Sequence, residues 1–201
     1  MEERMARYPS DHKGATRQRI IETAGRRLKR NGIDGSGVAA LMKDAGLTNG
    51  AFYAHFTSKE DLVATAISEQ LREQRRLLAD IPPGRAGIEQ VVRRYLSPEH
   101  RDNPEDGCPS AALLDEISRC PEATRQVYTE GGLAFIDDLA ARLAPHDPRS
   151  ARTTIASVYA LMIGTLQLSR TLTDPQLADD LLDQGIRNAI SVLDTATATI
   201  A

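Results

Sequence analysis

Hydrophobic residues recur at helical spacing along almost the whole chain, and no segment sustains the alternation of apolar and polar residues that a half-buried strand requires. A clear example lies at about 16–32, where Ile20, Ala24 and Leu28 follow one another in steps of four. Proline and glycine interrupt this pattern, most strongly in the Ile-Pro-Pro-Gly sequence at 81–84, because proline cannot continue a helix. The sequence therefore predicts an all-α protein.

The interruptions divide the chain into a series of expected helices. They cover about 16–32, 38–45, 48–55, 59–80, 88–96, 110–119, 121–143, 149–172 and 175–195. Gly32 and Gly46 suit helix C-termini, and Ser58 or Thr57 with an acidic residue three positions later suits a capping box. The polar stretch at 97–109 is predicted to be a loop. We expect an N-terminal domain at 1–60 and a larger helical domain at 61–201, with the helix at 59–80 connecting them.

Composition limits where such a chain works. No apolar run approaches the roughly 18 residues that a membrane-spanning helix needs, and the N-terminus lacks the apolar core of a signal peptide. The two cysteines, Cys108 and Cys120, are too few for a disulfide framework. These features predict a cytoplasmic protein with no membrane partner.

The net charge of −3 is unevenly distributed. Residues 1–60 contain eleven Lys and Arg against seven Asp and Glu, whereas residues 61–201 contain fourteen against twenty-one. A basic segment joined to an acidic body indicates that the N-terminal part meets a polyanion such as nucleic acid.

The aromatic residues concentrate in one short stretch, Gly-Leu-Thr-Asn-Gly-Ala-Phe-Tyr-Ala-His-Phe-Thr-Ser-Lys-Glu-Asp-Leu at 46–62. Phe52 and Phe56 are one helical turn apart and are predicted to face inward, whereas Tyr53 and His55 fall on other faces. Two short helices joined at Gly46 suit a helix-turn-helix unit, in which exposed hydroxyl and imidazole groups can meet phosphate oxygens. Taken without its surroundings, the same cluster is equally consistent with core filling.

This stretch, with the amphipathic helix before it, resembles the DNA-binding signature of the tetracycline-repressor (TetR) family of bacterial transcriptional regulators. The resemblance is specific over about residues 15–65. It implies an all-α homodimer with an N-terminal three-helix helix-turn-helix domain, followed by a larger helical domain that binds a small-molecule effector and dimerises. It also implies double-stranded operator DNA as a partner and a ligand-responsive regulator, in most cases a repressor released by its effector.

The resemblance assigns roles to particular residues of the N-terminal domain. Thr48, Asn49 and Ala51 are expected to read base edges and nearby phosphates. Tyr53, His55 and Lys59 are expected to position phosphates, and the hydroxyl of Ser36 or the backbone of Gly37 to touch phosphate at the start of the second helix. A ligand-binding module that keeps the motif without binding DNA remains an alternative.

In the second domain the expected effector pocket is drawn from Tyr95, Cys108, Leu113, Tyr128, Phe135, Tyr159 and Met162. Cys108 precedes Pro109, which suits the first position of a helix, and a thiol at a helix N-terminus has a lowered pKa. Cys108 is therefore either a sensor of oxidants or electrophiles, or a buried structural cysteine. An enzyme that uses Cys108 is the competing class, with His100 as the nearest base in sequence.

The last two expected helices carry apolar stripes at helical spacing. By the resemblance they form the dimer interface, through Ile155, Val158, Leu166, Leu182, Ile186, Ala189 and Leu193. Packing within one subunit explains the same spacing. The four histidines have no metal-ligating partner at helical spacing, and no phosphate-binding loop or catalytic triad is recognisable, so we expect no metal, no cofactor and no enzyme activity.

Overall fold

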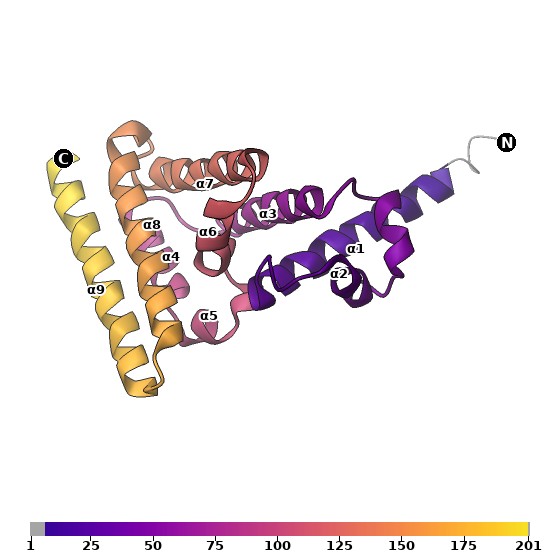
Figure 1. Cartoon of the computed structure of the whole chain (residues 1–201). Helices are drawn as coiled ribbons and strands as arrows, with labels where there is room; N and C mark the ends of the chain where they lie inside the picture. The colour runs from indigo at the N-terminus through magenta and orange to yellow at the C-terminus, as the bar shows by residue number, and fades with distance from the viewer. Residues whose placement is uncertain (1–6, 201) are drawn as a thin grey trace.

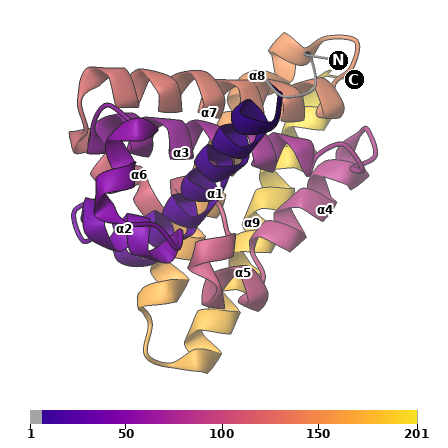
Figure 2. The same cartoon turned by 90° about the vertical axis from the view of Figure 1, so that its right-hand side faces the viewer.

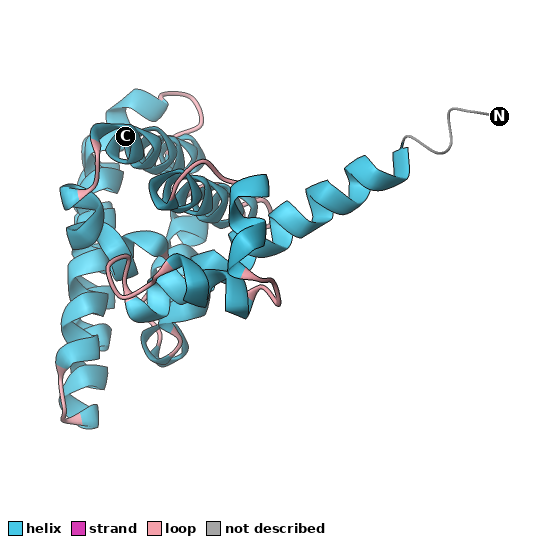
Figure 3. Cartoon of the chain, turned by 45° about the vertical axis from the view of Figure 1, so that its right-hand side comes forward, coloured by secondary structure: helices cyan, strands magenta, loops and turns pink. Residues whose placement is uncertain are grey.

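The computed structural model describes residues 7–200, and side chains within 12–195. Every regular element in that range is helical, as Figure 3 shows. The elements in chain order are α1 (Arg7–Asn31), α2 (Val38–Asp44), η1 (Asn49–Ala54), α3 (Lys59–Arg76), α4 (Arg85–Tyr95), α5 (Pro98–Asp102), η2 (Pro104–Asp106), α6 (Pro109–Arg119), α7 (Glu122–Leu143), α8 (Pro148–Thr171) and α9 (Pro175–Ile200). The predicted all-α class is confirmed.

The N-terminal domain is built from α1, α2 and η1, closed by the first part of α3 (Figure 1). Helix α1 buries the stripe formed by Ile20, Ala24 and Leu28, and Gly32 ends it with a φ of 78°. Gly46 makes the turn after α2 with a φ of 70°, a left-handed conformation that suits glycine. The sequence predicted an ordinary third helix at 48–55, but this segment is a six-residue 3₁₀ helix.

The proline pair at 82–83 separates α3 from α4 as predicted, although α3 already ends at Arg76. Gly87 lies so close to the chain before it that an added Cβ would be 1.8 Å from the carbonyl oxygen of Pro82. Only glycine fits this approach without a shift of the backbone. The first turn of α4 therefore packs closely against the proline pair that precedes it.

The predicted loop at 97–109 contains two helical turns, α5 and η2, which corrects the sequence prediction. The Ser97 hydroxyl accepts a hydrogen bond from the backbone N–H of His100 at 3.1 Å, and Pro98 occupies the first turn of α5. Serine followed by proline is a helix-start signal that the polar composition of this stretch obscured. These turns bring 100–108 against the rest of the second domain.

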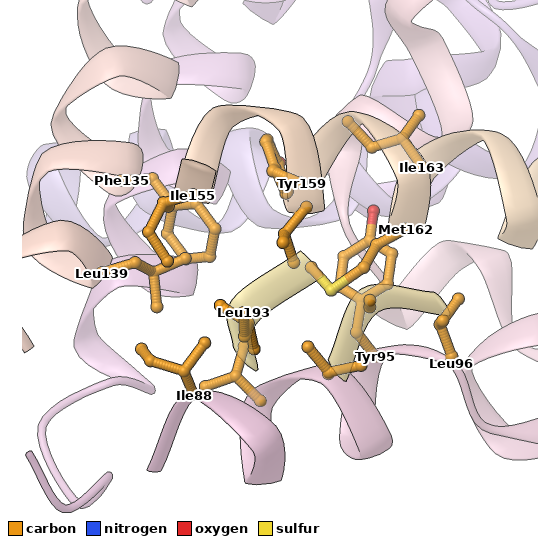
Figure 4. Packing of buried hydrophobic residues seen from close by; sticks show 14 of the residues in the cluster. Ile88, Tyr95, Leu96, Phe135, Leu139, Ile155, Tyr159, Met162, Ile163 and Leu193 are labelled. Carbon is orange, nitrogen blue, oxygen red and sulfur yellow. The ribbon is translucent and has the colours of Figure 1, made fainter. Parts of the chain in front are cut away.

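Two hydrophobic cores share the chain. The C-terminal core joins α4, α6, α7, α8 and α9, and Figure 4 shows its central side chains, among them Tyr95, Phe135 and Tyr159. The N-terminal core extends along α3 to Leu71 and includes Leu113 and Ile117 of α6. Helix α6 therefore contributes to both cores. The division of the chain at residue 60 stays a prediction.

Helices α8 and α9 pack side by side on the side of the molecule opposite α1 (Figures 1 and 2). The residues expected to form a dimer interface lie inside this subunit's own core. Ile155, Val158, Leu166, Leu182, Ala189 and Leu193 are at most 3% exposed, and Ile186 is half-buried. The six buried side chains present little surface to a second subunit, whereas Ile186 is partly accessible, so the expected dimer face stays a prediction. The exposed sides of the two helices carry other leucines, Leu168 and Leu177, each 52% exposed.

Among the described residues no helix combines the length and the apolar composition that crossing a membrane would require.

Truncating Leu113 tests the dual packing of α6. Leu113 is 1% exposed in the N-terminal core, so Leu113→Ala should lower the free energy of unfolding by about 2–5 kcal/mol, measured by urea denaturation. The matched control is the exposed Leu133→Ala on α7, for which we expect less than about 1 kcal/mol. Equal effects of the two substitutions would contradict the placement of Leu113 in a tightly packed core.

Candidate nucleic-acid interface and interior cavity

The aromatic cluster of the motif is divided between core and surface. Phe52 and Phe56 are buried and stack with their ring centroids 5.9 Å apart. Tyr53 packs edge-on against Phe52 but is 77% exposed, which leaves its hydroxyl in solvent. Thr48, the N-cap residue of this short helix, and Asn49, its first residue, are exposed. The two phenylalanines thus anchor η1, while its other side chains are displayed outward.

A basic surface lies beside η1, and the sequence analysis missed part of it. The Arg17 guanidinium lies over the Phe56 ring, 4.8 Å from its centroid. Burial lowers the pKa of His55, and the positive charges of Lys13 and Arg17 lower it further. The expected helix began near residue 16 and so left Lys13 out, although its four-residue spacing from Arg17 places the two on one helix face.

Two predicted contacts at the start of α2 have different outcomes. Ser36 is fully buried, and its hydroxyl donates a hydrogen bond to the carbonyl oxygen of Gly32 at 2.7 Å. It cannot reach a phosphate, which corrects the expected hydroxyl contact. Gly37 is exposed and α2 has no side-chain cap, so the alternative contact through the Gly37 backbone stays a prediction.

Lys59 is half-buried and donates a hydrogen bond to the carbonyl oxygen of Ile33 at 2.6 Å. Its ammonium group therefore holds the loop between α1 and α2 against the start of α3. Ser58 caps α3 by accepting from the backbone N–H of Asp61 at 3.2 Å, as the sequence predicted. Whether Lys59 also contacts phosphate stays a prediction, as do the roles of Ala51, which is half-buried, and His55.

A cavity of about 510 Å³ lies in the second domain between α3, α4 and the 97–109 segment. Of the residues predicted to bind an effector, Tyr95, Cys108 and Phe135 line it. A second hollow of about 520 Å³, between α6, α7 and α8, is lined by Tyr128 and Tyr159 instead. Leu113 lies in the N-terminal core and Met162 in the C-terminal core, and neither lines either of these two hollows. The expected single pocket is thus spread over four places.

Cys108 is buried at the N-terminus of α6, where its sulfur lies 3.2 Å from the Tyr159 hydroxyl and accepts from Gln74 Nε2 at 3.3 Å. His100 is brought to it in space but does not face the thiol. The Nε2 atom of His100 accepts a hydrogen bond from the backbone N–H of Cys108 at 3.0 Å, and its Nδ1 donates to the carbonyl oxygen of Tyr95 at 2.7 Å. Both ring nitrogens are occupied, so His100 offers no base to the sulfur.

Lys29 of α1 also lines this cavity. The sequence indicated only that a basic residue at this position suits a helix C-terminus. It donates a hydrogen bond to the carbonyl oxygen of Gly107 at 2.8 Å. Burial lowers the pKa of Lys29 to about 8, and the neighbouring Cys108 and Asp106 oppose that shift. A residue of the N-terminal domain therefore forms part of the wall of the cavity in the second domain.

Two further contacts hold α1 and its following loop to the segment around α6. Arg26 forms an ion pair with Asp106 at the cavity end of α6. In the C-terminal part of α6, the Glu116 carboxylate accepts hydrogen bonds from the backbone N–H groups of Ile33 and Asp34, at 2.7 and 3.1 Å. Helix α6 thus connects the cavity, which lies at its N-terminal end, with the loop that precedes α2, which Glu116 contacts nearer its C-terminal end.

The fold and the exposed η1 surface define a helix-turn-helix protein with a second, cavity-containing helical domain. No group of three or more potential metal-ligating side chains occurs among the residues described. Residues 20–66 match the family model for bacterial regulatory proteins of the tetR family. The chain is 26% identical over 165 residues to the HTH-type transcriptional regulator LmrA of Bacillus subtilis (strain 168), an alignment that covers 79% of this chain and 88% of LmrA.

A second relative matches in the N-terminal part alone. The HTH-type transcriptional regulator AcrR of Shigella flexneri is 38% identical over 58 residues, which span 29% of this chain and 27% of AcrR. Among solved structures, the reduced form of Escherichia coli NemR superposes with a TM-score of 0.72 at 18% identity, covering 87% of this chain and 95% of NemR. A TetR-family regulator from Agrobacterium tumefaciens gives a TM-score of 0.74 at 19% identity, covering 89% and 97%. Residues 20–66 thus carry the DNA-binding domain of the TetR family of transcriptional regulators, and most of the chain is similar to the transcriptional regulator LmrA.

The buried His100 generates a prediction about acid stability. Burial mainly, with the positive charges of Arg170 and Lys29, lowers the pKa of His100 from 6.5 to about 4. Between pH 6.5 and 4, His100 is therefore protonated in the unfolded chain and neutral in the folded chain. The contribution of neutral His100 to the free energy of unfolding is complete above pH 6.5 and falls as the pH drops towards 4. This loss should reach at most about 3 kcal/mol.

Urea denaturation at several pH values measures this effect. His100→Gln should flatten the fall in unfolding free energy between pH 6.5 and 4, whereas the exposed His146→Gln should leave it unchanged. An unaltered slope in His100→Gln would show that other groups cause the acid sensitivity.

Proposed function

We propose that this regulator is a homodimeric repressor that binds operator DNA through η1 and the neighbouring face of α1, and that a small molecule in the 510 Å³ cavity releases it. The observation that carries the proposal is the shared wall of that cavity, to which α1 contributes Lys29. A ligand in this position touches the DNA-binding domain directly. The match of residues 20–66 to the tetR family model and the similarity to the transcriptional regulator LmrA support the DNA-binding part of the proposal.

On the DNA side, we assign base reading to Thr48, Asn49 and Ala51. The Tyr53 hydroxyl, which is exposed, is suited to donate to a phosphate oxygen. Lys13 and Arg17 extend the basic surface next to His55, and their charges suit the adjacent backbone of the duplex. Phosphate contacts set the position of η1 and carry no sequence information, whereas its smaller side chains supply the base contacts.

On the dimer side, we retain α8 and α9 as the interface helices but assign their exposed faces. Leu168 and Leu177 are each 52% exposed, and Val192 is 36% exposed. Large apolar side chains displayed on neighbouring helices suit burial against a second copy with two-fold symmetry. Such a dimer would place two η1 helices about 34–36 Å apart, the spacing of successive major grooves.

Release follows as a population shift. A ligand that prefers the form in which α1 is displaced lowers the fraction of dimers with correctly spaced reading surfaces. A preference of roughly 1–3 kcal/mol is sufficient for a 5- to 150-fold change in operator affinity.

The DNA-binding assignment predicts different effects for phosphate and base contacts. Lys13→Ala and Tyr53→Ala should weaken binding to all sequences, and Lys13→Ala should reduce the slope of log affinity against log salt by about 1. Asn49→Ala should instead change the preferred sequence. Gel-shift titrations from 50 to 200 mM salt, on fragments selected from random DNA and from the DNA beside the gene, measure both quantities.

The control for this series is Arg149→Ala at the start of α8, which removes an exposed positive charge far from η1. It should leave the affinity and the salt slope unchanged. If Lys13→Ala and Tyr53→Ala behave like Arg149→Ala, the assigned docking surface is wrong. If no sequence is enriched by the selection, the chain is a ligand-binding module without operator binding.

The dimer assignment predicts that one charged side chain on the exposed leucine face breaks the assembly. Leu168→Glu and Leu177→Glu should each shift the protein from dimer to monomer in sedimentation equilibrium, because a carboxylate buried without a partner costs several kcal/mol. Leu133 on α7 is also exposed, at 42%, so Leu133→Glu is the control and should remain dimeric. A wild-type monomer would contradict the proposal directly.

A further inference from the structure

We propose that the 510 Å³ cavity takes an organic anion, a carboxylate on an aromatic or similarly compact apolar body, with the carboxylate at the N-terminus of α6. The inference deepens the proposed function by naming the class of ligand for the same cavity. It concerns binding alone, which requires no DNA.

The first support is that Lys29, a cation of the cavity wall, has no carboxylate partner among the described residues. Lys29 is a half-buried cation in the cavity wall, and it donates a 2.8 Å hydrogen bond to the Gly107 carbonyl oxygen. Among the described residues, no carboxylate lies within 4.0 Å of the Lys29 ammonium group. The salt bridges of this part of the chain are all formed by arginines. An ammonium group has three donors, so a ligand carboxylate can pair with Lys29 while the Gly107 contact is kept or exchanged.

The second support is the start of α6. This helix has eleven residues, carries no side-chain cap, and turns Cys108 and Pro109 into the cavity wall. The N-terminus of a helix has a partial positive charge, which favours an anion nearby. Because the Cys108 N–H is donated to His100 and Pro109 has no N–H, α6 attracts the carboxylate through this charge and not through a hydrogen bond from these two residues.

The third support is a set of buried polar groups that lack partners. Tyr95 is 7% exposed and lines the cavity, and its hydroxyl makes no hydrogen bond of normal geometry. Burial, and after it the nearby Cys108 thiol, raises the pKa of Tyr95. Gln70 lines the same cavity with both amide atoms buried and unpaired. Buried polar groups without partners are costly, so a ligand that pairs with them binds favourably. The phenolic hydroxyl and the amide N–H groups are donors to a carboxylate.

The acids around the cavity do not cancel this preference. Asp106 is paired with Arg26, and Glu73 is paired with Arg76. Glu99 is the remaining acid of the lining and is exposed. Lys29 and the exposed Arg94 are cations of the lining that have no carboxylate within 4.0 Å among the described residues. The unpaired charge of the wall is therefore positive. Of its two unpaired cations, Lys29 is more buried than Arg94.

The rest of the wall selects the body of the ligand. Leu78, Ile81, Val91 and Phe135 supply apolar surface on the side of the cavity formed by α3, α4 and α7. A volume of about 510 Å³ lies in the range that holds a compact organic molecule. A small inorganic anion would leave this surface uncovered, so we expect phosphate and acetate to bind weakly.

Calorimetric titration of the DNA-free, full-length protein tests the inference with a matched pair of probes, 2-naphthoate and its neutral amide, 2-naphthamide. We expect 2-naphthoate to bind at least about tenfold more tightly. Lys29→Met should remove this difference, by weakening 2-naphthoate and not 2-naphthamide, and Lys29→Arg should largely restore it. Tyr95→Phe should weaken 2-naphthoate by about three- to tenfold. Lys43→Met, an exposed lysine of α2, is the control and should change nothing. Circular dichroism and thermal melting check that each variant is folded.

Equal binding of the two probes, binding of 2-naphthoate that survives Lys29→Met, or no saturable binding of 2-naphthoate at millimolar concentration would each overturn the inference. None of these results bears on operator binding. Conversely, if 2-naphthoate binds through Lys29 but leaves an operator complex intact in a gel shift, the ligand class stands and the proposed release mechanism fails.

Discussion

The arrangement of the molecule depends on the packing of α6 into both hydrophobic cores. Leu113 and Ile117 are enclosed by the N-terminal core, whereas Ala111 and Cys108 belong to the C-terminal core. A helix of three turns is stiff over this length because each turn is held by backbone hydrogen bonds. Movement at its cavity end is therefore transmitted to its other end, so the two cores cannot shift independently of each other.

The polar contacts around α6 are unequal in strength. Arg26 and Asp106 are both more than half exposed, and exposed ion pairs contribute about 0–1 kcal/mol. The Glu116 carboxylate accepts from two backbone N–H groups, each a charge-assisted bond of roughly 1.5–3 kcal/mol. Glu116 is therefore the stronger connection to the N-terminal domain, and the ion pair at the cavity end is the one that a ligand can disturb at low cost.

Sequence reasoning succeeded where a local rule decides the structure and failed where packing decides it. The spacing of Ile20, Ala24 and Leu28 and the prolines at 82–83 predicted helices and a break that the structure contains. The stripes on α8 and α9 gave the buried faces correctly but could not say which molecule buries them. Periodicity cannot indicate that Lys29 lines a cavity, because that position depends on Gly107, which is 78 residues away in sequence.

The continuity of α1 provides a physical route for the proposed effect of a ligand in the cavity on DNA contacts. Arg17 lies at the η1 end and Lys29 at the cavity end of one uninterrupted helix, twelve residues apart, or about 18 Å at 1.5 Å per residue. A tilt of about 5° around the cavity end would move the Arg17 end by about 1.6 Å over that length. Hydrogen bonds to phosphate tolerate only about 0.5 Å, so this tilt is enough to break them. In a two-fold dimer the displacement occurs in both subunits, and the change in spacing between the two reading surfaces is larger than either movement alone.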